Sequence, residues 1–273
     1  MAVVKLPDGS KRDVADGSSV MQVAESIGKG LAKAAVAGRV DGKVVDLSAK
    51  IEPGEHSLSI LTDRDADALL VLRHSTAHVM AEAIQRLWPS AKLAYGPALE
   101  TGFYYDIALD QPISANDFPK IEAEMEKIVA ENRAFNRYDL PVNDGLDRLK
   151  HEGNKYKIDN ALRAIEGGAK SLSWYVTGEK DKNWEDLCMG PHVPSTGKIK
   201  GFKIMSVAQS HWHGDVSSDK FQRVYGTAFF DKKQLDEHLK QLEEAKKRDH
   251  RVLGPQLGLF AIDEQVGQGL VLW

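Results

Sequence analysis

The segment RHSTAHVMAEAIQRLWP places His74 and His78 four residues apart. This spacing puts both imidazoles on one face of an α-helix, where they can share a ligand. Apolar side chains recur through the segment at helical spacing, no glycine interrupts it, and Pro89 follows it, so the pattern predicts a helix. The pair by itself does not define a site, because a histidine on a half-buried helix face is more often structural.

A second pair, Cys188 and His192, lies in DLCMGPHVP with three residues between its members. Gly190 and Pro191 indicate a turn there, so both side chains can point inward. Together with the two histidines of the predicted helix, the pair offers four ligands suited to tetrahedral Zn²⁺ or to hydrolytic acid–base chemistry. The alternative is a buried thiol beside a turn histidine, which would have only a structural role.

The elements that must position these side chains belong to an ordinary globular protein. The chain has 273 residues, 42% hydrophobic and 28% charged, which is long enough for two modest domains. Its longest apolar run, residues 68–72, is far shorter than the ~20 residues that cross a bilayer, and no targeting segment is recognisable, so a cytoplasmic protein is expected. A single cysteine excludes an internal disulfide. The net charge of −4 argues against unspecific nucleic-acid binding, so any RNA contact must be local.

Residues 1–61 are predicted to form a small domain of four or five strands packed on one helix. The polar stretch TDRDAD, which begins at Thr62, marks its end. The predicted elements are a hairpin with a Pro-Asp-Gly turn, a helix, a second hairpin with an Asp-Gly turn and a final strand, in residues 3–14, 19–38, 36–47 and 52–61.

Residues 62–230 are predicted to form a larger α+β domain that contains the histidine helix. A strand, a turn and a strand are expected in residues 94–107, and helices in 116–135 and 143–153. Four further segments have the pattern of strands or strand edges, namely residues 171–178, 186–194, 201–214 and 221–230.

Residues 231–252 predict a long exposed helix with a basic end. Four cations stand against one local acid, Asp249, and would suit contact with the phosphates of an RNA: Lys246, Lys247, Arg248 and Arg251. The alternative is a solvated surface stabilised by ion pairs along the helix.

Five segments resemble the N-terminal half of bacterial threonyl-tRNA synthetases: RHSTAHVMAEAIQRLWP, GFYYDI, DLCMGPHVPSTG, FQRVYGTAFFDKK and LEEAKKRDHRVLGPQLGLF. The resemblance covers essentially the whole chain. It implies a TGS domain of ubiquitin-like β-grasp fold in residues 1–61 and an editing domain, shared with alanyl-tRNA synthetases, in residues 62–230. Residues 231–273 would be a linker helix and the start of a class II catalytic core. Since the sequence stops at VGQGLVLW, no aminoacylation is expected from this chain alone.

The function implied by the resemblance is proofreading, the hydrolysis of serine wrongly attached to tRNA(Thr). Serine lacks only a methyl group relative to threonine, and one methyl in a pocket is worth about 1 to 3 kcal/mol, so a second, hydrolytic sieve is needed. The implied partner is tRNA(Thr) charged with serine. Dimerisation is expected mainly through the missing catalytic core, and no membrane contact is expected.

The resemblance also implies residue roles. Six residues carry over as members of the hydrolytic site: His74, His78, Lys157, Asp186, Cys188 and His192. Gly96 would allow close approach of the backbone to the terminal adenosine. Tyr104, Tyr105 and Tyr175 could stack on the adenine, although aromatic residues on strands more often fill a core. The basic residues of the C-terminal helix would bind tRNA.

The residue types and the resemblance differ about metal. The four residues of the two pairs are suited to Zn²⁺, and the alanyl relatives hold zinc at this place, whereas bacterial threonyl editing sites are expected to work through water and side chains. We therefore expect no required metal, with Zn²⁺ possible at the two pairs. Two alternative functions stay open: a non-catalytic tRNA-binding module, and a zinc-dependent deacylase for another aminoacyl-tRNA such as that of alanine.

Overall fold

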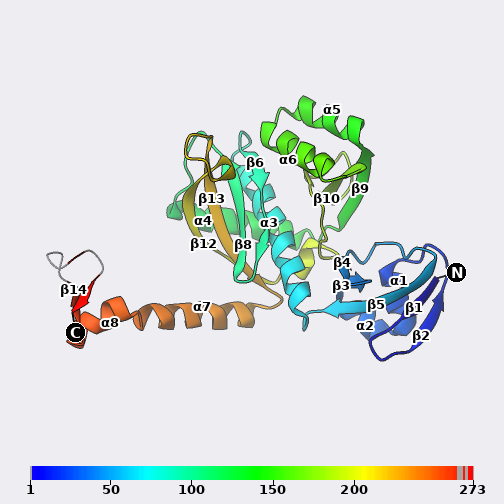
Figure 1. Cartoon of the computed structure of the whole chain (residues 1–273), viewed down its shortest axis with the longest axis horizontal. Helices are drawn as coiled ribbons and strands as arrows, with labels where there is room; N and C mark the ends of the chain where they lie inside the picture. Colours follow the sequence, from blue (N-terminus) through cyan, green and yellow to red (C-terminus); the bar gives the residue numbers. More distant parts are fainter. Residues whose placement is uncertain (1, 263–266, 268–269, 273) are drawn as a thin grey trace. The chain divides into compact units, whose positions relative to one another are not determined.

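The computed structural model of the chain describes residues 2–262, 267 and 270–272, and it divides into two compact units, Met1–Phe230 and Asp231–Trp273. The architecture is α+β, as predicted, with three sheets in the first unit (Figure 1). Among the described residues, none of the helices combines the length and the apolar character needed to cross a membrane.

A mixed five-stranded sheet with two short helices forms the N-terminal part of the first unit. The sheet order is β2-β1-β5-β3-β4, and the pair of β1 and β5 is parallel while its other pairs are antiparallel. The elements are β1 (Ala2–Lys5), β2 (Lys11–Val14), α1 (Val20–Ile27), α2 (Lys29–Ala34), β3 (Ala35–Val40), β4 (Lys43–Val45) and β5 (Gly54–Thr62).

The predicted helix 19–38 forms two helices, α1 and α2, and the prediction was wrong only at residues 35–38. The helix starts as expected, because the Ser19 side chain accepts from the Gln22 backbone and the Gln22 side chain accepts from the Ser19 backbone. It breaks at Gly28, and residues 35–40 form β3 instead. Pairing with β5 and burial of the apolar residues at the start of β3 outweigh the local helical spacing.

A second sheet of five strands holds the central helix. Its order is β12-β13-β8-β6, with β7 also paired to β8. The helix α3 packs on β8 and β13 and is buried on nearly all sides, and α4 packs on α3 (Figure 1). The elements are α3 (Ala66–Leu87), β6 (Lys92–Tyr95), β7 (Ala98–Leu99), β8 (Gly102–Ala108), α4 (Phe118–Ala130), β12 (Gly201–His211) and β13 (Lys220–Phe229). Short 3-10 turns lie at Ala115–Asp117, Thr196–Lys198 and Trp212–Gly214.

A three-stranded antiparallel sheet covered by two helices completes the first unit. Its order is β11-β10-β9, and its elements are β9 (Phe135–Pro141), α5 (Val142–Glu152), α6 (Lys155–Glu166), β10 (Ser171–Thr177) and β11 (Glu185–Leu187). The helix α5, which ends at the left-handed Gly153, matches the helix predicted for residues 143–153, whereas β9 and α6 were not predicted. The segment of α6 is rich in charged residues, and its start is fixed by Asn154, whose side chain accepts from the backbone of Tyr156 and Lys157.

The second unit contains α7 (Lys232–Lys247), α8 (His250–Gln256) and a short pair of strands, β14 (Ala261–Ile262) and β15 (Val271–Leu272). The single helix predicted for residues 231–252 was wrong at its end, because the chain leaves the helix at Arg248 and a new helix begins at His250. The Asp249 carboxylate accepts from the Arg251 backbone N–H beside this new start. The segment VGQGLVLW lies partly outside the described residues.

Candidate functional site

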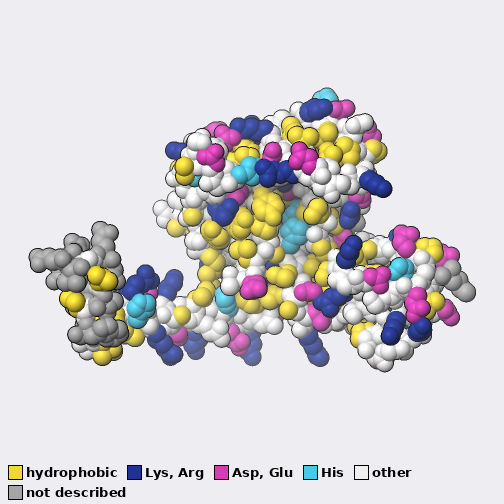
Figure 2. All heavy atoms as spheres, in the orientation of Figure 1, with side chains coloured by type: hydrophobic (Ala, Val, Ile, Leu, Met, Phe, Trp, Pro, Cys, Tyr) yellow, Lys and Arg dark blue, Asp and Glu magenta, His cyan; other side chains and the backbone are white. Residues whose placement is uncertain are grey.

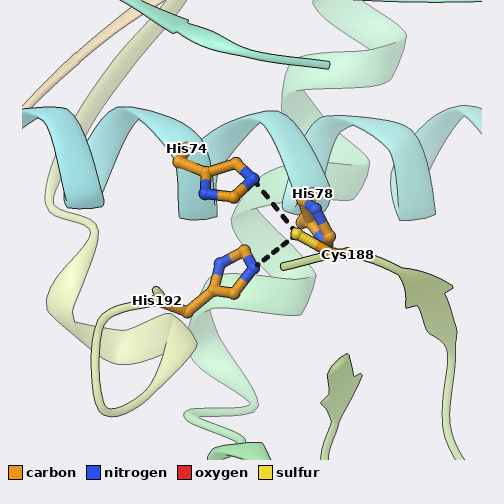
Figure 3. A group of neighbouring side chains, drawn as sticks. All are labelled: His74, His78, Cys188 and His192. Atoms are coloured by element: carbon orange, nitrogen blue, oxygen red, sulfur yellow. Dashed lines mark hydrogen bonds between the residues drawn. The ribbon is translucent and has the colours of Figure 1, made fainter. Parts of the chain in front are cut away.

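The two predicted pairs of side chains meet in one cluster (Figure 3). His74 and His78 lie on α3, and Cys188 and His192 lie on the loop that follows β11. One ligand atom from each residue lies within 4.8 Å of those of the other three. The Cys188 Sγ is 3.3 Å from His74 Nε2 and 3.5 Å from His192 Nε2. We call these four residues the His/Cys cluster.

Neighbouring groups set the tautomer of His192. The Ser75 hydroxyl donates its single proton to the Val71 carbonyl over 2.8 Å, and its oxygen accepts from the Val193 N–H. His192 Nδ1 lies 3.1 Å from the same oxygen and must therefore be the donor. The Nε2 of His192 then presents a free lone pair to the Cys188 sulfur.

The same reasoning applies to His74. Its Nδ1 lies 3.3 Å from the Pro191 carbonyl oxygen, which can only accept, so Nδ1 donates and Nε2 faces Cys188 Sγ as an acceptor. The Gly190 N–H also points at this sulfur, at 3.3 Å. A thiol carries one proton, so it can satisfy only one of the two imidazole lone pairs. The His/Cys cluster therefore has acceptor capacity left over.

Burial keeps the His/Cys cluster uncharged. It lowers the pKa of His74 to about 4 and holds the pKa values of His78 and His192 well below their ordinary range. Burial also raises the pKa of the Cys188 thiol to about 12. At neutral pH the cluster consists of three neutral imidazoles and a thiol, which can accept protons or bind a cation.

The His/Cys cluster has the donor set and spacing of a zinc site. Tetrahedral bonds of the usual lengths would separate sulfur from nitrogen by about 3.6 Å, close to the two observed distances. His78 also offers one ligand nitrogen, and its buried Nδ1 makes no hydrogen bond to any of the described residues. The four residues could therefore hold a metal ion, on condition that the thiol loses its proton.

A second cluster, which we call the Lys/Asp cluster, consists of Tyr105, Lys157 and Asp186 from β8, α6 and β11. Lys157 Nζ lies 2.7 Å and 2.8 Å from the two carboxylate oxygens of Asp186, and both side chains are nearly buried. The Tyr105 hydroxyl donates to Asp186 over 2.5 Å and accepts from Lys157 over 3.0 Å. Burial and the adjacent Asp186 charge raise the pKa of Tyr105 well above its ordinary value.

Both clusters face a cavity of about 630 Å³. Its lining includes His74, His78 and Cys188 of the His/Cys cluster and all three residues of the Lys/Asp cluster. Figure 2 shows hydrophobic and histidine side chains gathered near the middle of the face in view. Gly96 lines the cavity, and a Cβ there would run into the Tyr105 ring, so this packing by itself accounts for the glycine.

The tyrosines named from the sequence lie in different places. Tyr105 lines the cavity, whereas the neighbouring Tyr104, on the opposite face of β8, lies under the Arg223 guanidinium at 4.0 Å. Tyr175 is 1% exposed, and its hydroxyl donates to Asp46. Neither Tyr104 nor Tyr175 is among the residues that line the cavity.

The basic residues at the end of α7 have more acidic neighbours than the sequence analysis expected. Lys247 lies 3.3 Å from Glu243 and 3.1 Å from Glu244, and Arg251 lies 2.6 Å from Asp249. The expectation of one local acid was therefore wrong. All four cations, Lys246, Lys247, Arg248 and Arg251, are exposed.

Two residues of the site escaped the sequence analysis. Ser75, which orients His192, stands beside His74 on α3, but nothing in its local sequence distinguishes it from other helix serines. Asp46 follows β4, in the N-terminal sheet region, and accepts from the His192 backbone N–H over 2.8 Å. Its contact joins positions 146 residues apart, which no local pattern reports.

Two family models match the chain. Residues 2–62 match the TGS domain, and residues 175–225 match the threonyl and alanyl tRNA synthetase second additional domain. The second match contains two of the four residues of the His/Cys cluster, Cys188 and His192.

The curated proteins similar to this chain are threonine–tRNA ligases. The chain is 45% identical to a threonine–tRNA ligase of Pelobacter propionicus, 46% to one of Halalkalibacterium halodurans and 47% to one of Anoxybacillus flavithermus. These matches cover 99%, 100% and 99% of this chain and 41%, 42% and 41% of the relatives. The chain thus spans about two fifths of the length of the curated relatives that it matches. The resemblance to threonyl-tRNA synthetases is therefore confirmed: the chain is similar to threonine–tRNA ligases over nearly its whole length, and it carries matches to the TGS domain and to the second additional domain of threonyl and alanyl tRNA synthetases.

Proposed function

We propose that this chain hydrolyses the ester that joins a wrongly attached amino acid to the terminal ribose of a tRNA, with serine on tRNA(Thr) as the substrate. Residues 1–61 would be the TGS domain, residues 62–230 the editing domain, and residues 231–273 a linker helix with the start of a class II catalytic core. The relatives are named as threonine–tRNA ligases, which supports tRNA as the partner and a cytoplasmic localisation. The second family match, over residues 175–225, is likewise to a domain of threonyl and alanyl tRNA synthetases.

The observation that carries the proposal is the convergence of three neutral imidazoles on one thiol in the wall of a cavity. Hydrolysis of an ester needs a positioned water molecule and a group that takes its proton during attack on the carbonyl carbon. His74 or His78 supplies that base, because both line the cavity and both are unprotonated at neutral pH. The base then returns the proton to the departing ribose oxygen.

The Lys/Asp cluster holds the substrate in this proposal. Asp186 places carboxylate oxygens in the lining, and besides the contacts with Lys157 and Tyr105 these oxygens can accept a hydrogen bond from the α-ammonium group of the aminoacyl moiety. Lys157 and the Tyr105 hydroxyl fix the orientation of that carboxylate. A cavity of about 630 Å³ exceeds the size of a seryl group, so the terminal adenosine would occupy the remainder.

Zn²⁺ is not required in our proposal, although the His/Cys cluster fits it. When bound by His74, His78, Cys188 and His192, zinc would supply a Lewis acid and a more acidic water molecule. This fit favours one alternative, a zinc-dependent deacylase that acts on another aminoacyl-tRNA.

The test supplies the chain with tRNA(Thr) carrying either serine or threonine, with and without a strong chelator, and follows hydrolysis of the ester. We expect cleavage of the seryl ester, sparing of the threonyl ester by steric exclusion of its methyl group, and little effect of chelator. His192→Ala should lower the rate by about 10-fold or more. His151→Ala is the matched control, because His151 is an exposed histidine on α5.

Each other outcome has a definite reading. Loss of activity on chelation and its return with zinc would establish the zinc-dependent alternative. Preference for an alanyl ester on its own tRNA would change the substrate. Absence of hydrolysis of every ester, with tRNA binding retained, would leave a non-catalytic tRNA-binding module.

A further inference from the structure

We infer that Asp46, which belongs to the N-terminal sheet region, is a positioning residue for the His/Cys cluster. It acts through the loop that carries Cys188 and His192, so the TGS domain becomes a working part of the hydrolytic site. The inference rests on the proposed function for its catalytic readout, while its structural readout is independent of that function.

Both carboxylate oxygens of Asp46 accept hydrogen bonds from residues outside the N-terminal sheet region. Oδ1 accepts from the His192 backbone N–H over 2.8 Å, and Oδ2 accepts from the Tyr175 hydroxyl over 2.5 Å. The Tyr175 ring in turn lies against the His192 imidazole, with ring centroids 4.4 Å apart. One side chain therefore fixes the backbone of His192 and the aromatic ring that packs on its imidazole.

The TGS side of this contact is firmly held. Asp46 directly follows β4, and the next residue, Leu47, is buried in the core of the N-terminal sheet. The carbonyls of Leu47 and Ala49 accept from the backbone N–H groups of Met21 and Val20 in the first turn of α1. The carboxylate thus projects from a segment tied to both a strand and a helix start, which limits how far it can move.

The loop on the other side leaves little room for adjustment. Gly190 has a φ of +71°, in the left-handed region, and a Cβ at this position would collide with the Tyr175 hydroxyl. The loop is therefore pressed against the same hydroxyl that Asp46 holds. Val44, two residues before Asp46, also lines the cavity, so this strand end contributes to the wall as well as to the support.

Removing the carboxylate would leave two buried donors without acceptors, the Tyr175 hydroxyl and the His192 N–H. The loop should then shift to find other partners, which displaces His192 relative to His74 and Cys188. A displacement of about 1 Å at a catalytic group costs up to about 100-fold in rate, because the reacting atoms are no longer aligned. Substrate binding by the Lys/Asp cluster should change much less.

The experiment compares Asp46→Ala, Asp46→Asn and Tyr175→Phe with the unaltered chain. For seryl-tRNA(Thr) hydrolysis, Asp46→Ala should lower kcat by about 10- to 100-fold and leave KM within about 2-fold. Asp46→Asn should recover most of the rate, because the amide oxygen still accepts from His192 and the amide N–H₂ can donate to the Tyr175 oxygen. Tyr175→Phe, which removes one of the two hydrogen bonds without creating a cavity, should lower kcat by about 3-fold or more.

A second readout uses the fact that Cys188 is the only cysteine of the chain. Its rate of alkylation by a small thiol reagent should rise several-fold in Asp46→Ala as the loop loosens, and should stay unchanged in Asp46→Asn. Lys198→Met is the matched control. Lys198 Nζ donates to the Lys33 carbonyl, so the substitution removes another hydrogen bond to the N-terminal sheet region without changing the loop.

The outcomes separate the two claims. If the unaltered chain hydrolyses no ester, the proposed function fails, and alkylation of Cys188 still decides whether Asp46 holds the loop. Equal kcat and equal alkylation rates in Asp46→Ala would overturn the inference, as would an equal loss in Lys198→Met. If Asp46→Ala does not fold, an unchanged kcat in Tyr175→Phe would overturn it instead.

Discussion

The two clusters that face the cavity differ in how far their polar groups are satisfied. In the Lys/Asp cluster, both oxygens of Asp186 and the hydroxyl of Tyr105 are hydrogen-bonded, and the charges of Lys157 and Asp186 compensate each other. In the His/Cys cluster the groups are neutral, two imidazole lone pairs compete for one thiol proton, and the Nδ1 of His78 finds no hydrogen-bond partner in the described part of the chain.

This difference suggests that the Lys/Asp cluster orients the substrate and that the His/Cys cluster takes part in the reaction. A charged group whose hydrogen bonds are all satisfied keeps its position, which suits the orientation of an aminoacyl group. Removing one member of such a pair leaves the opposite charge buried without a counter-ion. A neutral group with an unused lone pair is free to take a proton or a metal ion, which suits chemistry. We expect substitutions in the Lys/Asp cluster mainly to lower the stability of the fold, and substitutions in the His/Cys cluster mainly to lower the rate of hydrolysis.

The largest effect should follow removal of the Asp186 carboxylate. Asp186→Ala leaves the nearly buried Lys157 ammonium without its counter-ion and should lower the free energy of unfolding by about 3 to 5 kcal/mol in urea denaturation. The double variant Lys157→Met with Asp186→Leu should recover much of that loss, because no buried charge remains. A single variant as stable as the unaltered chain would mean that water reaches Lys157.

The converse should hold in the His/Cys cluster. The double variant His74→Gln with His78→Gln should lower kcat for seryl ester hydrolysis by about 100-fold, because neither position in the cavity lining then carries an imidazole that can take the proton from water. Its free energy of unfolding should fall by less than that of Asp186→Ala. If the order of the two stability losses is reversed, the division between holding and reacting groups is wrong.

The pH dependence of stability should come from the neutral histidines. Burial lowers the pKa of His74 to about 4, while the unfolded chain binds a proton near 6.5. Between these values the unfolded state binds more protons, so stability falls as the pH falls, by up to about 1.4 kcal/mol per pH unit for each buried histidine. Denaturation series from pH 7.5 to 5 measure this slope, and His74→Gln should reduce it. Bound zinc would steepen the slope, so the series should be repeated with chelator.

The smallest effect concerns the second unit. Replacing Lys246, Lys247 and Arg248 with glutamine should weaken tRNA binding and flatten its salt dependence by at most about one slope unit for each lost phosphate contact. The reduction should be smallest for Lys247, which already pairs with two glutamates. Binding measured at several salt concentrations tests this, and unchanged slopes would leave the basic end of α7 as a solvated surface.

Local sequence pattern is enough to predict much of the fold. The helical spacing from Leu69 to Leu87 and the following Pro89 predicted α3, and glycine turns predicted both hairpins of the N-terminal sheet. These elements follow from neighbours within a few residues, such as alternation, turn residues and caps. The same local information named all four members of the His/Cys cluster by type and spacing.

Long-range packing decided the rest. The strand β9 and the helix α6 have exposed, charged faces, so only pairing with β10 and packing on α5 identify them as regular elements. Alternation requires Tyr104 and Tyr105 to face opposite sides of β8, but the packing of the sheet selects Tyr105 for the cavity.

What the sequence by itself determined is therefore the set of reactive groups and the helix that carries two of them. What the tertiary structure decided is their meeting: His74 and Cys188 are 114 positions apart, and Asp46 reaches His192 across 146. Such contacts arise when burial of separate apolar faces brings distant segments together, and burial also makes the imidazoles neutral. Burial is a property of the packed chain, so neither the assembly of the site nor its protonation state can be read from neighbouring residues.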